Sequence, residues 1–247
     1  MSNEYKPHTL EWTDEKVARF WNFRNNYKLY DETWFTEQIG DAVLKFTNKI
    51  SGIKGKVLDY GTGKGFLVQH LLSLFPSVEV YACDFTDGVA EATAEKYKNK
   101  KQFKGCEHIT QLPSVYADNS FDTVFFIETI EHLTDQYLNG TMTELYRILK
   151  PGGTIVITTP NDEVLEKQFV HCVDCGASFH HMQHIRSWND QSLTALADAY
   201  GFSKLYCKGM NLKQYGKNAF FQIAMDTVKK VVSKPNVEHL VFIGKKK

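Results

Sequence analysis

From about residue 56 onward, short apolar runs alternate with amphipathic stretches. The run at 120–127, Ser-Phe-Asp-Thr-Val-Phe-Phe-Ile, is apolar on both faces, which is typical of a central strand in a parallel sheet. Alternating strands and helices predict a parallel sheet with right-handed crossovers. Strands are expected at 56–60, 78–83, 103–106, 120–127, 154–159, 202–208 and 239–244, and helices at 64–75, 87–98, 135–149, 190–200 and 217–232.

The first fifty residues show a different pattern, because aromatic side chains recur at helical spacing between residues 10 and 50. This pattern predicts a helical extension at 1–52, followed by one α/β domain at 53–247. Aromatic side chains at this spacing usually pack into a core. The alternative is that the extension forms a lid over a substrate pocket.

A glycine-rich loop joins the first predicted strand to the first helix of the domain. Gly61, Gly63 and Gly65 allow a ligand to approach the backbone closely, where the N–H groups of a helix N-terminus point outward. Asp84 ends the next strand, where an acid can accept both hydroxyls of a ribose. Asp59, two residues ahead of the loop, would repel a pyrophosphate but would suit an amino-acid ammonium. An adenosine with an amino-acid end describes S-adenosyl-L-methionine.

In this D-x-G-x-G-x-G loop and the acid after the second strand, the chain resembles the class I S-adenosylmethionine-dependent methyltransferases. Family-like passages at 112–113, 118–122 and 149–153 extend the resemblance over roughly 55–245. It implies a doubly wound α/β fold, with a seven-stranded, mostly parallel, Rossmann-like sheet whose last strand is antiparallel. It implies cofactor contacts by Asp59, Tyr60, Gly61, Thr62, Gly63, Gly65, Asp84, Phe85, Glu107 and Ile127. Among these, Glu107 substitutes for an aspartate that the family often has after the third strand, where this chain has Cys106.

Two carboxylates and an imidazole follow the fourth strand. Glu128, Glu131 and His132 are spaced i, i+3, i+4, so a helical turn would place them on one face beside the cofactor's methyl group. They could position cofactor and helix, or His132 or Glu131 could act as a general base. They could also bind a divalent cation, Mg²⁺, Mn²⁺ or Zn²⁺. The E-x-x-E-H passage resembles those of ubiquinone-pathway and small-RNA 3′-terminal O-methyltransferases, which imply metal-assisted methyl transfer to oxygen.

A Cys/His-containing loop at 170–186 is the second candidate site. Cys172, Cys175, His180 and His184 have the spacing C-x2-C-x4-H-x3-H, a compact version of a tetrahedral zinc pattern. However, His184 also resembles the loop histidine that is the fourth metal ligand of the small-RNA enzymes, and His181 could complete either set. The alternative is a histidine-rich surface loop with an inert or redox-active cysteine pair.

Composition limits the function classes. Lys plus Arg and Asp plus Glu both number 29, so no basic excess indicates a nucleic-acid surface, although RNA is not excluded. No apolar leader or membrane-length apolar stretch is present, which favours the cytoplasm. We expect O-methylation of a small-molecule or saccharide-type substrate. The alternatives are an RNA 3′-terminal 2′-O-methyltransferase and a non-catalytic cofactor-binding partner protein. The oligomeric state stays open.

Overall fold

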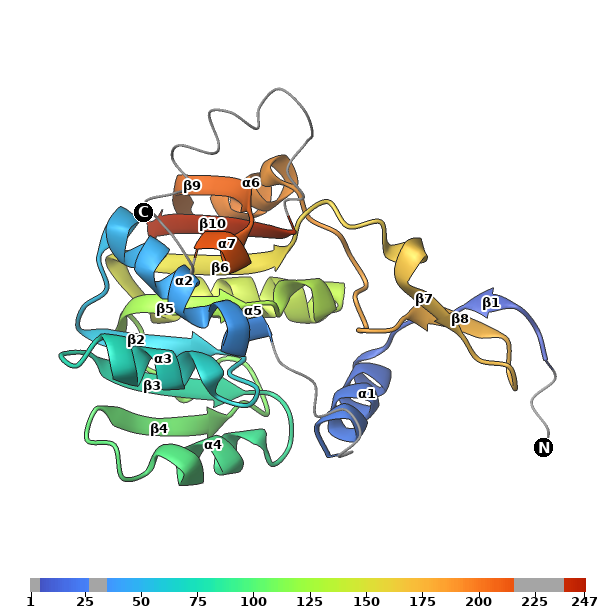
Figure 1. Ribbon diagram of the computed structural model, residues 1–247, viewed down its shortest axis with the longest axis horizontal. Coiled ribbons are helices and arrows are strands. Elements are labelled where there is room, and N and C mark those ends of the chain that lie inside the picture. Colours follow the sequence, from blue (N-terminus) through green and yellow to red (C-terminus); the bar gives the residue numbers. More distant parts are fainter. Residues whose placement is uncertain (1–4, 27–34, 216–237) are drawn as a thin grey trace.

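The computed structural model describes residues 5–26, 35–215 and 238–247. Its main feature is a seven-stranded sheet in the order β4-β3-β2-β5-β6-β10-β9 (Figure 1). Among the described strands of this sheet, six run in the same direction and β10 alone runs in the opposite direction. This confirms the predicted doubly wound α/β sheet with an antiparallel last strand. The strands are β2 (Lys56–Tyr60), β3 (Glu79–Asp84), β4 (Phe103–His108), β5 (Phe121–Ile127), β6 (Leu149–Pro160), β9 (Phe202–Met210) and β10 (His239–Lys246).

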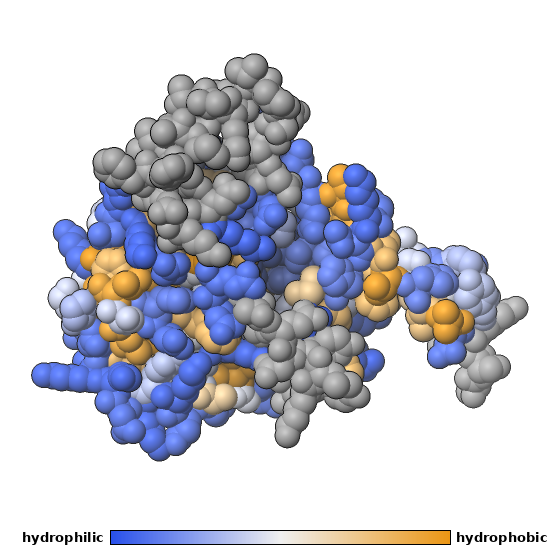
Figure 2. Space-filling model, viewed as in Figure 1, coloured by the Kyte–Doolittle hydropathy of each residue, from blue (hydrophilic) through white to orange (hydrophobic). Residues whose placement is uncertain are grey.

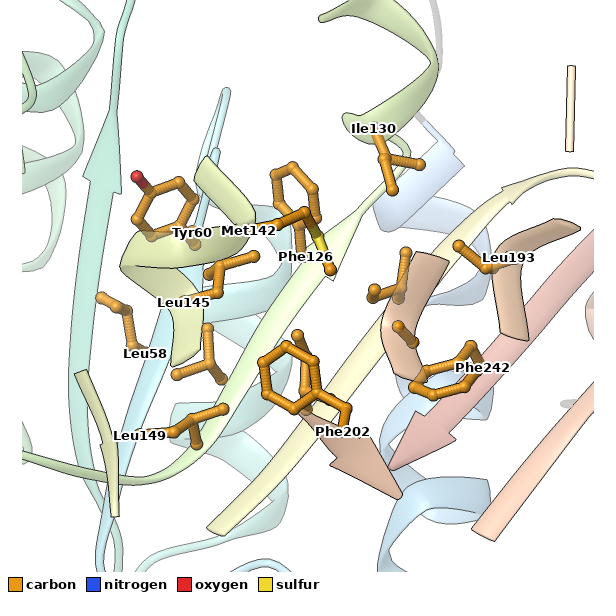
Figure 3. Packing of buried hydrophobic residues seen from close by; sticks show 14 of the residues in the cluster. Leu58, Tyr60, Phe126, Ile130, Met142, Leu145, Leu149, Leu193, Phe202 and Phe242 are labelled. Atoms are coloured by element: carbon orange, nitrogen blue, oxygen red, sulfur yellow. The ribbon is translucent and has the colours of Figure 1, made fainter. Parts of the chain in front are cut away.

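Helices cover both faces of the sheet, and strands such as β5 are therefore buried on both sides. One apolar cluster joins α2, α3, α4 and α7 to one face, and a second joins α5 and α6 to the other, where their side chains meet those of the strands (Figure 3). The helices are α2 (Phe35–Ser51), α3 (Phe66–Leu74), α4 (Val89–Tyr97), α5 (Asp135–Ile148), α6 (Asp190–Ala199) and α7 (Leu212–Tyr215). In the ranges that the structure describes, no helix has the length and apolarity to cross a membrane.

Most predicted elements are present within a few residues of their expected ends. The β6 strand is longer than expected, because Leu149 already pairs with Phe121 and the ladder resumes at Thr154 opposite Thr123. The α6 helix begins where expected, since the side chain of Asn189 accepts the backbone N–H groups of Gln191 and Ser192. The predicted helix at 217–232 lies outside the described residues.

A small second sheet, in the order β1-β8-β7, projects from the main body (Figure 1). We call the segment made by β1 (His8–Thr9), β7 (Phe169–His171), β8 (Ala177–His180) and the 172–176 turn the arm. Gly176 has a φ of 80°, and a Cβ there would lie 2.3 Å from the Lys6 carbonyl oxygen, so the turn requires glycine. The arm exposes the apolar side chains of Val170 and Val173, and Figure 2 shows hydrophobic surface on it.

The helix α1 (Asp14–Asn26) lies between the arm and the main body (Figure 1). The helix α2 is placed differently, because its buried face packs into the apolar cluster on the main sheet. Within the predicted extension at 1–52, β1 and α1 therefore lie apart from the sheet's covering layer, whereas α2 belongs to it.

Candidate active site

A cavity of about 420 Å³ lies at the carboxyl ends of the central strands, beneath α1. Its walls include Gly61 after β2, Asp84 at the end of β3, His108 at the end of β4 and Glu128 after β5. Ligands of open α/β sheets bind at this edge, and the volume is in the range of small-molecule sites. The cavity is therefore the candidate active site.

The glycine loop forms one wall of the cavity. Gly61 has a φ of 84°, and a Cβ there would lie 2.8 Å from the Thr129 hydroxyl oxygen, so the turn requires glycine. Asp59 does not line the cavity. Its Oδ2 accepts a hydrogen bond of 2.7 Å from the Thr62 hydroxyl, and burial raises the pKa of Asp59 to about 7. In this structure, Asp59 therefore stabilises the glycine loop through Thr62. Its carboxylate does not line the cavity where the ammonium of the cofactor was expected.

Asp84 lies where the sequence predicts an acid for a ribose. Its Oδ2 accepts the Gly63 N–H at 2.8 Å, and its Oδ1 accepts the Thr86 N–H at 2.8 Å. Burial raises the pKa of Asp84, although these hydrogen bonds oppose the shift. A carboxylate has about four acceptor sites, so both oxygens can still accept ligand hydroxyls. Phe85 also lines the cavity.

Several predicted cofactor residues do not line the cavity. Tyr60 and Ile127 are buried in the two apolar clusters, and Thr62 and Gly65 support the glycine loop. Glu107 is exposed, and its neighbours His108, Ile109 and Thr110 line the cavity instead. The register accounts for this placement, since Glu107 pairs with Cys83 and His108 pairs with Asp84 at the strand ends. Only strand pairing decides which of two adjacent residues reaches the cavity.

The α1 helix forms the opposite wall. Its cavity-lining residues are Asp14, Val17, Ala18, Trp21 and Asn22, which have the i, i+3, i+4, i+7, i+8 spacing of one helix face. This spacing is visible in the sequence and could have identified them. The indole N–H of Trp21 donates to Gln183 Oε1 at 2.7 Å, and the centroids of the Trp21 and His132 rings are 4.8 Å apart. The α1 helix is thereby tied to the loop that follows the arm.

The E-x-x-E-H passage does not form the expected helical turn. Glu128 has a φ of 47°, and the 3-10 turn η2 (Ile130–His132) follows it. Glu128 Oε2 lies 3.6 Å from His239 Nδ1, whereas Glu128 Oε1 is buried with no hydrogen-bond partner among the described residues. Glu128 nevertheless lies close enough to Glu131 for its charge to raise the pKa of that carboxyl, after burial as the larger cause.

Glu131 and His132 meet His184 from the loop after the arm. Ligand atoms of the three side chains lie within 4.8 Å of one another, and Glu131 Oε1 is 3.7 Å from His132 Nε2. The Thr159 hydroxyl donates to Glu131 Oε2 at 3.0 Å. Burial raises the pKa of Glu131 and lowers the pKa of His132, so the imidazole is neutral. Carboxylate and neutral imidazole suit a divalent cation, so we call Glu128, Glu131, His132 and His184 the acid–histidine cluster.

A second group within metal-binding distance consists of Glu163, His180 and His184. Glu163 Oε1 lies 3.2 Å from His180 Nε2, and Glu163 Oε2 lies 2.6 Å from His184 Nδ1. Partial burial alone would raise the pKa of Glu163, but these two hydrogen bonds outweigh it and lower the pKa to about 2. Glu163 (near η3, Leu165–Gln168) was not anticipated, and no local pattern in the sequence marks it.

The predicted zinc set is not assembled in the structure. Cys172 and Cys175 lie in the turn of the arm, and neither group of potential ligands in the described residues contains a cysteine. The strand β8 separates the cysteines from His180, because an extended chain advances about 3.3 Å per residue. His181 Nδ1 lies 3.2 Å from the Gln168 carbonyl oxygen, outside both groups. Hydrogen bonds with the backbone of Cys175 and Asp174 lower the pKa of the Cys172 thiol.

Known proteins match this sequence. A family model described as a methyltransferase domain matches residues 30–206. The ubiquinone/menaquinone biosynthesis C-methyltransferase of Desulfotalea psychrophila is 31% identical over 109 residues, 43% of this chain and 42% of the relative. The malonyl-[acyl-carrier protein] O-methyltransferase of Hahella chejuensis is 26% identical over 142 residues, 57% of this chain and 49% of the relative. The chain thus spans about half the length of such curated relatives, or less.

Solved structures share the fold. The 1,6-didemethyltoxoflavin-N1-methyltransferase of Burkholderia thailandensis, with bound 1,6-didemethyltoxoflavin and S-adenosylhomocysteine, has a TM-score of 0.68 at 14% identity, over 98% of this chain and 94% of its own. The complex between the Haloferax volcanii Trm112 methyltransferase activator and a putative methyltransferase gives a TM-score of 0.62 at 17% identity, over 96% and 99% of the chains. Because the family model covers well over half of the chain, this protein belongs to the methyltransferase domain family.

Proposed function

We propose that this protein is an S-adenosylmethionine-dependent methyltransferase that acts on an oxygen of a small-molecule or saccharide-type acceptor. The observation that carries the proposal is the buried acid–histidine cluster, whose Glu128 and His132 line the same cavity as the glycine loop and Asp84. A hydroxyl acceptor needs a group that removes its proton, and this cluster is placed to supply one. The Hahella relative, an O-methyltransferase, and the Desulfotalea relative, a C-methyltransferase, show that the family includes both acceptor atoms.

The cofactor would lie along the glycine loop. Asp84 is placed to accept the ribose hydroxyls, while Phe85 and Ile109 offer apolar surface for the adenine. Gly61 and Gly63 leave the backbone open to the methionine end. The methyl group of the bound cofactor would then be available to an acceptor held between α1 and the acid–histidine cluster.

The residues present fit a divalent cation. Glu128 Oε1 is a buried carboxylate oxygen without a hydrogen-bond partner in the part of the chain that the structure describes, and Glu131 is a second buried carboxylate beside it. A buried and a partly buried carboxylate side by side, with no lysine or arginine in the cluster, lack the positive charge that would stabilise their ionised forms. Glu128, Glu131, His132 and His184 would hold the ion. When bound, the cation would acidify the acceptor hydroxyl.

The chain's own residues supply orientation and proton transfer. The cavity walls formed by α1 and the glycine loop hold acceptor and methyl donor together, since methyl transfer depends chiefly on proximity and alignment. The Trp21 ring packs edge-to-face against the His132 ring, with centroids 4.8 Å apart, and so helps to fix the orientation of the imidazole. Without a cation, His132 itself would accept the hydroxyl proton.

The charge of the cavity favours uncharged acceptors over RNA. Among its described lining residues are Asp14, Asp84, Asp87 and Glu128, and none is lysine or arginine. Phosphate groups are usually bound by basic side chains. The RNA 3′-terminal alternative is therefore less favoured, and it becomes one arm of the test.

The test is transfer of radioactive methyl from S-adenosylmethionine to a panel of saccharides, phenols, amines and a short RNA with a free 3′ end. It uses a variant with Cys172→Ser and Cys175→Ser, so that the cysteine pair cannot account for metal effects. We expect methyl ethers on a hydroxyl acceptor, loss of activity with EDTA, and recovery with Mg²⁺, Mn²⁺ or Zn²⁺. Activity that ignores EDTA would leave His132 as the base, and exclusive methylation of amines or carbon would contradict the proposal.

A further inference from the structure

Glu163 holds two histidines at once. Its two carboxylate oxygens lie 3.2 Å from His180 Nε2 and 2.6 Å from His184 Nδ1. The two imidazole rings are stacked, with centroids 4.2 Å apart and planes 15° from parallel. His180 is almost completely buried, and His184 and Glu163 are partly buried. Solvent therefore competes weakly for these hydrogen bonds, so their donors and acceptors determine where the protons lie.

The proton of His180 is placed by its neighbours. Its Nδ1 faces two backbone N–H groups, those of Met182 at 3.1 Å and His184 at 3.3 Å. A backbone N–H can only donate, so His180 Nδ1 is the acceptor and carries no proton. The proton of the neutral ring is then on Nε2, which donates it to Glu163. If His180 Nε2 bound a metal ion while Nδ1 kept these bonds, the neutral ring would have no place for its proton.

The proton of His184 is placed by the same carboxylate. Because Glu163 Oε2 accepts at 2.6 Å, His184 Nδ1 carries a proton, and in the neutral ring Nε2 is then the nitrogen with a free lone pair. Metal-binding histidines usually donate their other ring N–H to a carboxylate or carbonyl, which fixes the tautomer and the ring orientation. His132 has a comparable contact, since its Nδ1 lies 3.4 Å from the Gln183 carbonyl oxygen.

We propose that Glu163 and His180 are positioning residues that fix the His184 ring and present its Nε2 to an ion bound with Glu131 and His132. The two groups within metal-binding distance are then one metal site and its support, rather than two sites. This inference rests on the proposed metal-assisted function. It assigns a role to an acid that no sequence pattern marks and excludes His180 as a ligand.

The experiment compares Glu163→Gln, Glu131→Gln and the control Glu166→Gln, all in the background lacking Cys172 and Cys175. Glu166 is an exposed acid three residues after Glu163. Its substitution by glutamine makes the same chemical change at a position away from the histidines. Calorimetric titration with Mn²⁺ measures affinity and stoichiometry. Side-chain ¹⁵N spectra of the metal-free proteins report which nitrogen of His184 carries the proton, and S-adenosylhomocysteine binding reports an intact fold.

We expect one Mn²⁺ per chain, lost in Glu131→Gln and bound roughly 10–100-fold more weakly in Glu163→Gln. Glu166→Gln should match the parent, and S-adenosylhomocysteine binding should persist in all variants. The spectra should show His184 protonated on Nδ1 in the parent and a mixture of tautomers in Glu163→Gln.

Other outcomes separate the two proposals. Mn²⁺ binding that is lost in Glu163→Gln and normal in Glu131→Gln would place the ion in the Glu163 group and overturn the inference. Unchanged Mn²⁺ affinity and an unchanged His184 tautomer in Glu163→Gln would also overturn it while leaving the metal-assisted function intact. If the parent protein, which lacks Cys172 and Cys175, binds no Mn²⁺ but retains methyl transfer, the proposal of a metal-assisted reaction is wrong. In that case, a Glu163-dependent His184 tautomer would still support Glu163 as the residue that fixes the ring.

Discussion

The two halves of the cavity are built in different ways. The cofactor half comes from two adjacent strand ends, where backbone N–H groups of Gly63 and Thr86 hold Asp84. The acceptor half is assembled from segments far apart in the chain, since Trp21 meets Gln183 across 162 positions and Thr159 meets Glu131 across 28. The first half depends on local backbone conformation and the second on long-range side-chain contacts, so mutations should separate binding of the cofactor from turnover.

The largest expected effect is in the acceptor half. His132→Ala should lower turnover by roughly 10²–10⁴-fold, the usual contribution of a positioned group that moves a proton. Because His132 belongs to the acid–histidine cluster and not to the glycine loop or the Asp84 strand end, S-adenosylhomocysteine affinity should stay near wild type. Initial rates on the identified acceptor and calorimetry measure the two quantities. A His132→Ala enzyme with normal turnover would show that the cluster has a structural role only.

The cofactor half should respond in the opposite way. Asp84→Asn should weaken S-adenosylhomocysteine binding by about 1.5–3 kcal/mol, the range for hydrogen bonds to a charged group. Glu91→Gln is the control, because Glu91 is an exposed acid on the neighbouring helix α4. Calorimetric titration measures both variants. An Asp84→Asn protein with wild-type affinity would mean that the ribose binds elsewhere.

Loss of the contact between α1 and the 180–186 loop should have a smaller effect, which should be confined to binding of the acceptor. Trp21→Phe keeps an aromatic ring over His132 but removes the N–H that donates to Gln183. A neutral hydrogen bond contributes about 0.5–1.5 kcal/mol, so the KM of the acceptor should rise roughly 2–10-fold with cofactor affinity unchanged. Phe23→Leu, at an exposed position on the same helix, is the control. Equal effects of the two variants would argue against a specific role for the Trp21 contact.

The smallest expected effect concerns stability and pH. Burial raises the pKa of Asp59 from its ordinary value of 3.8 to about 7 in the folded protein, so between these pH values the folded state binds more protons than the unfolded state. The free energy of unfolding from this group is therefore highest below pH 4 and falls as the pH rises toward 7. Asp59→Asn removes this fall, so its melting temperature relative to wild type should increase from pH 5 to pH 8. Asp87→Asn, at an exposed position, should instead run parallel to wild type, and parallel curves for Asp59→Asn would contradict the burial argument.

The main sheet, the glycine loop and the position of Asp84 could all be predicted from the order of the residues. Strand and helix periodicity depend on neighbouring residues, and a turn such as that at Gly61 demands glycine whatever surrounds it, so these features can be recognised locally. The helical face of α1 that lines the cavity is likewise visible as a spacing. Strand register, in contrast, depends on how the strands pair. The observed register places His108 rather than Glu107 at the cavity.

The tertiary structure alone decided how the chemical residues are grouped. His180 and His184 could equally join Cys172 and Cys175 by spacing, but the extended β8 strand carries the histidines away from the cysteines. The positive φ of Glu128 and the 3-10 turn that follows it replace a helical face. Glu163 reaches His180 and His184 through folding of the segment between β6 and α6. Side-chain groupings of this kind depend on the path of the chain through space, because each contact joins residues whose sequence separation carries no periodic signal.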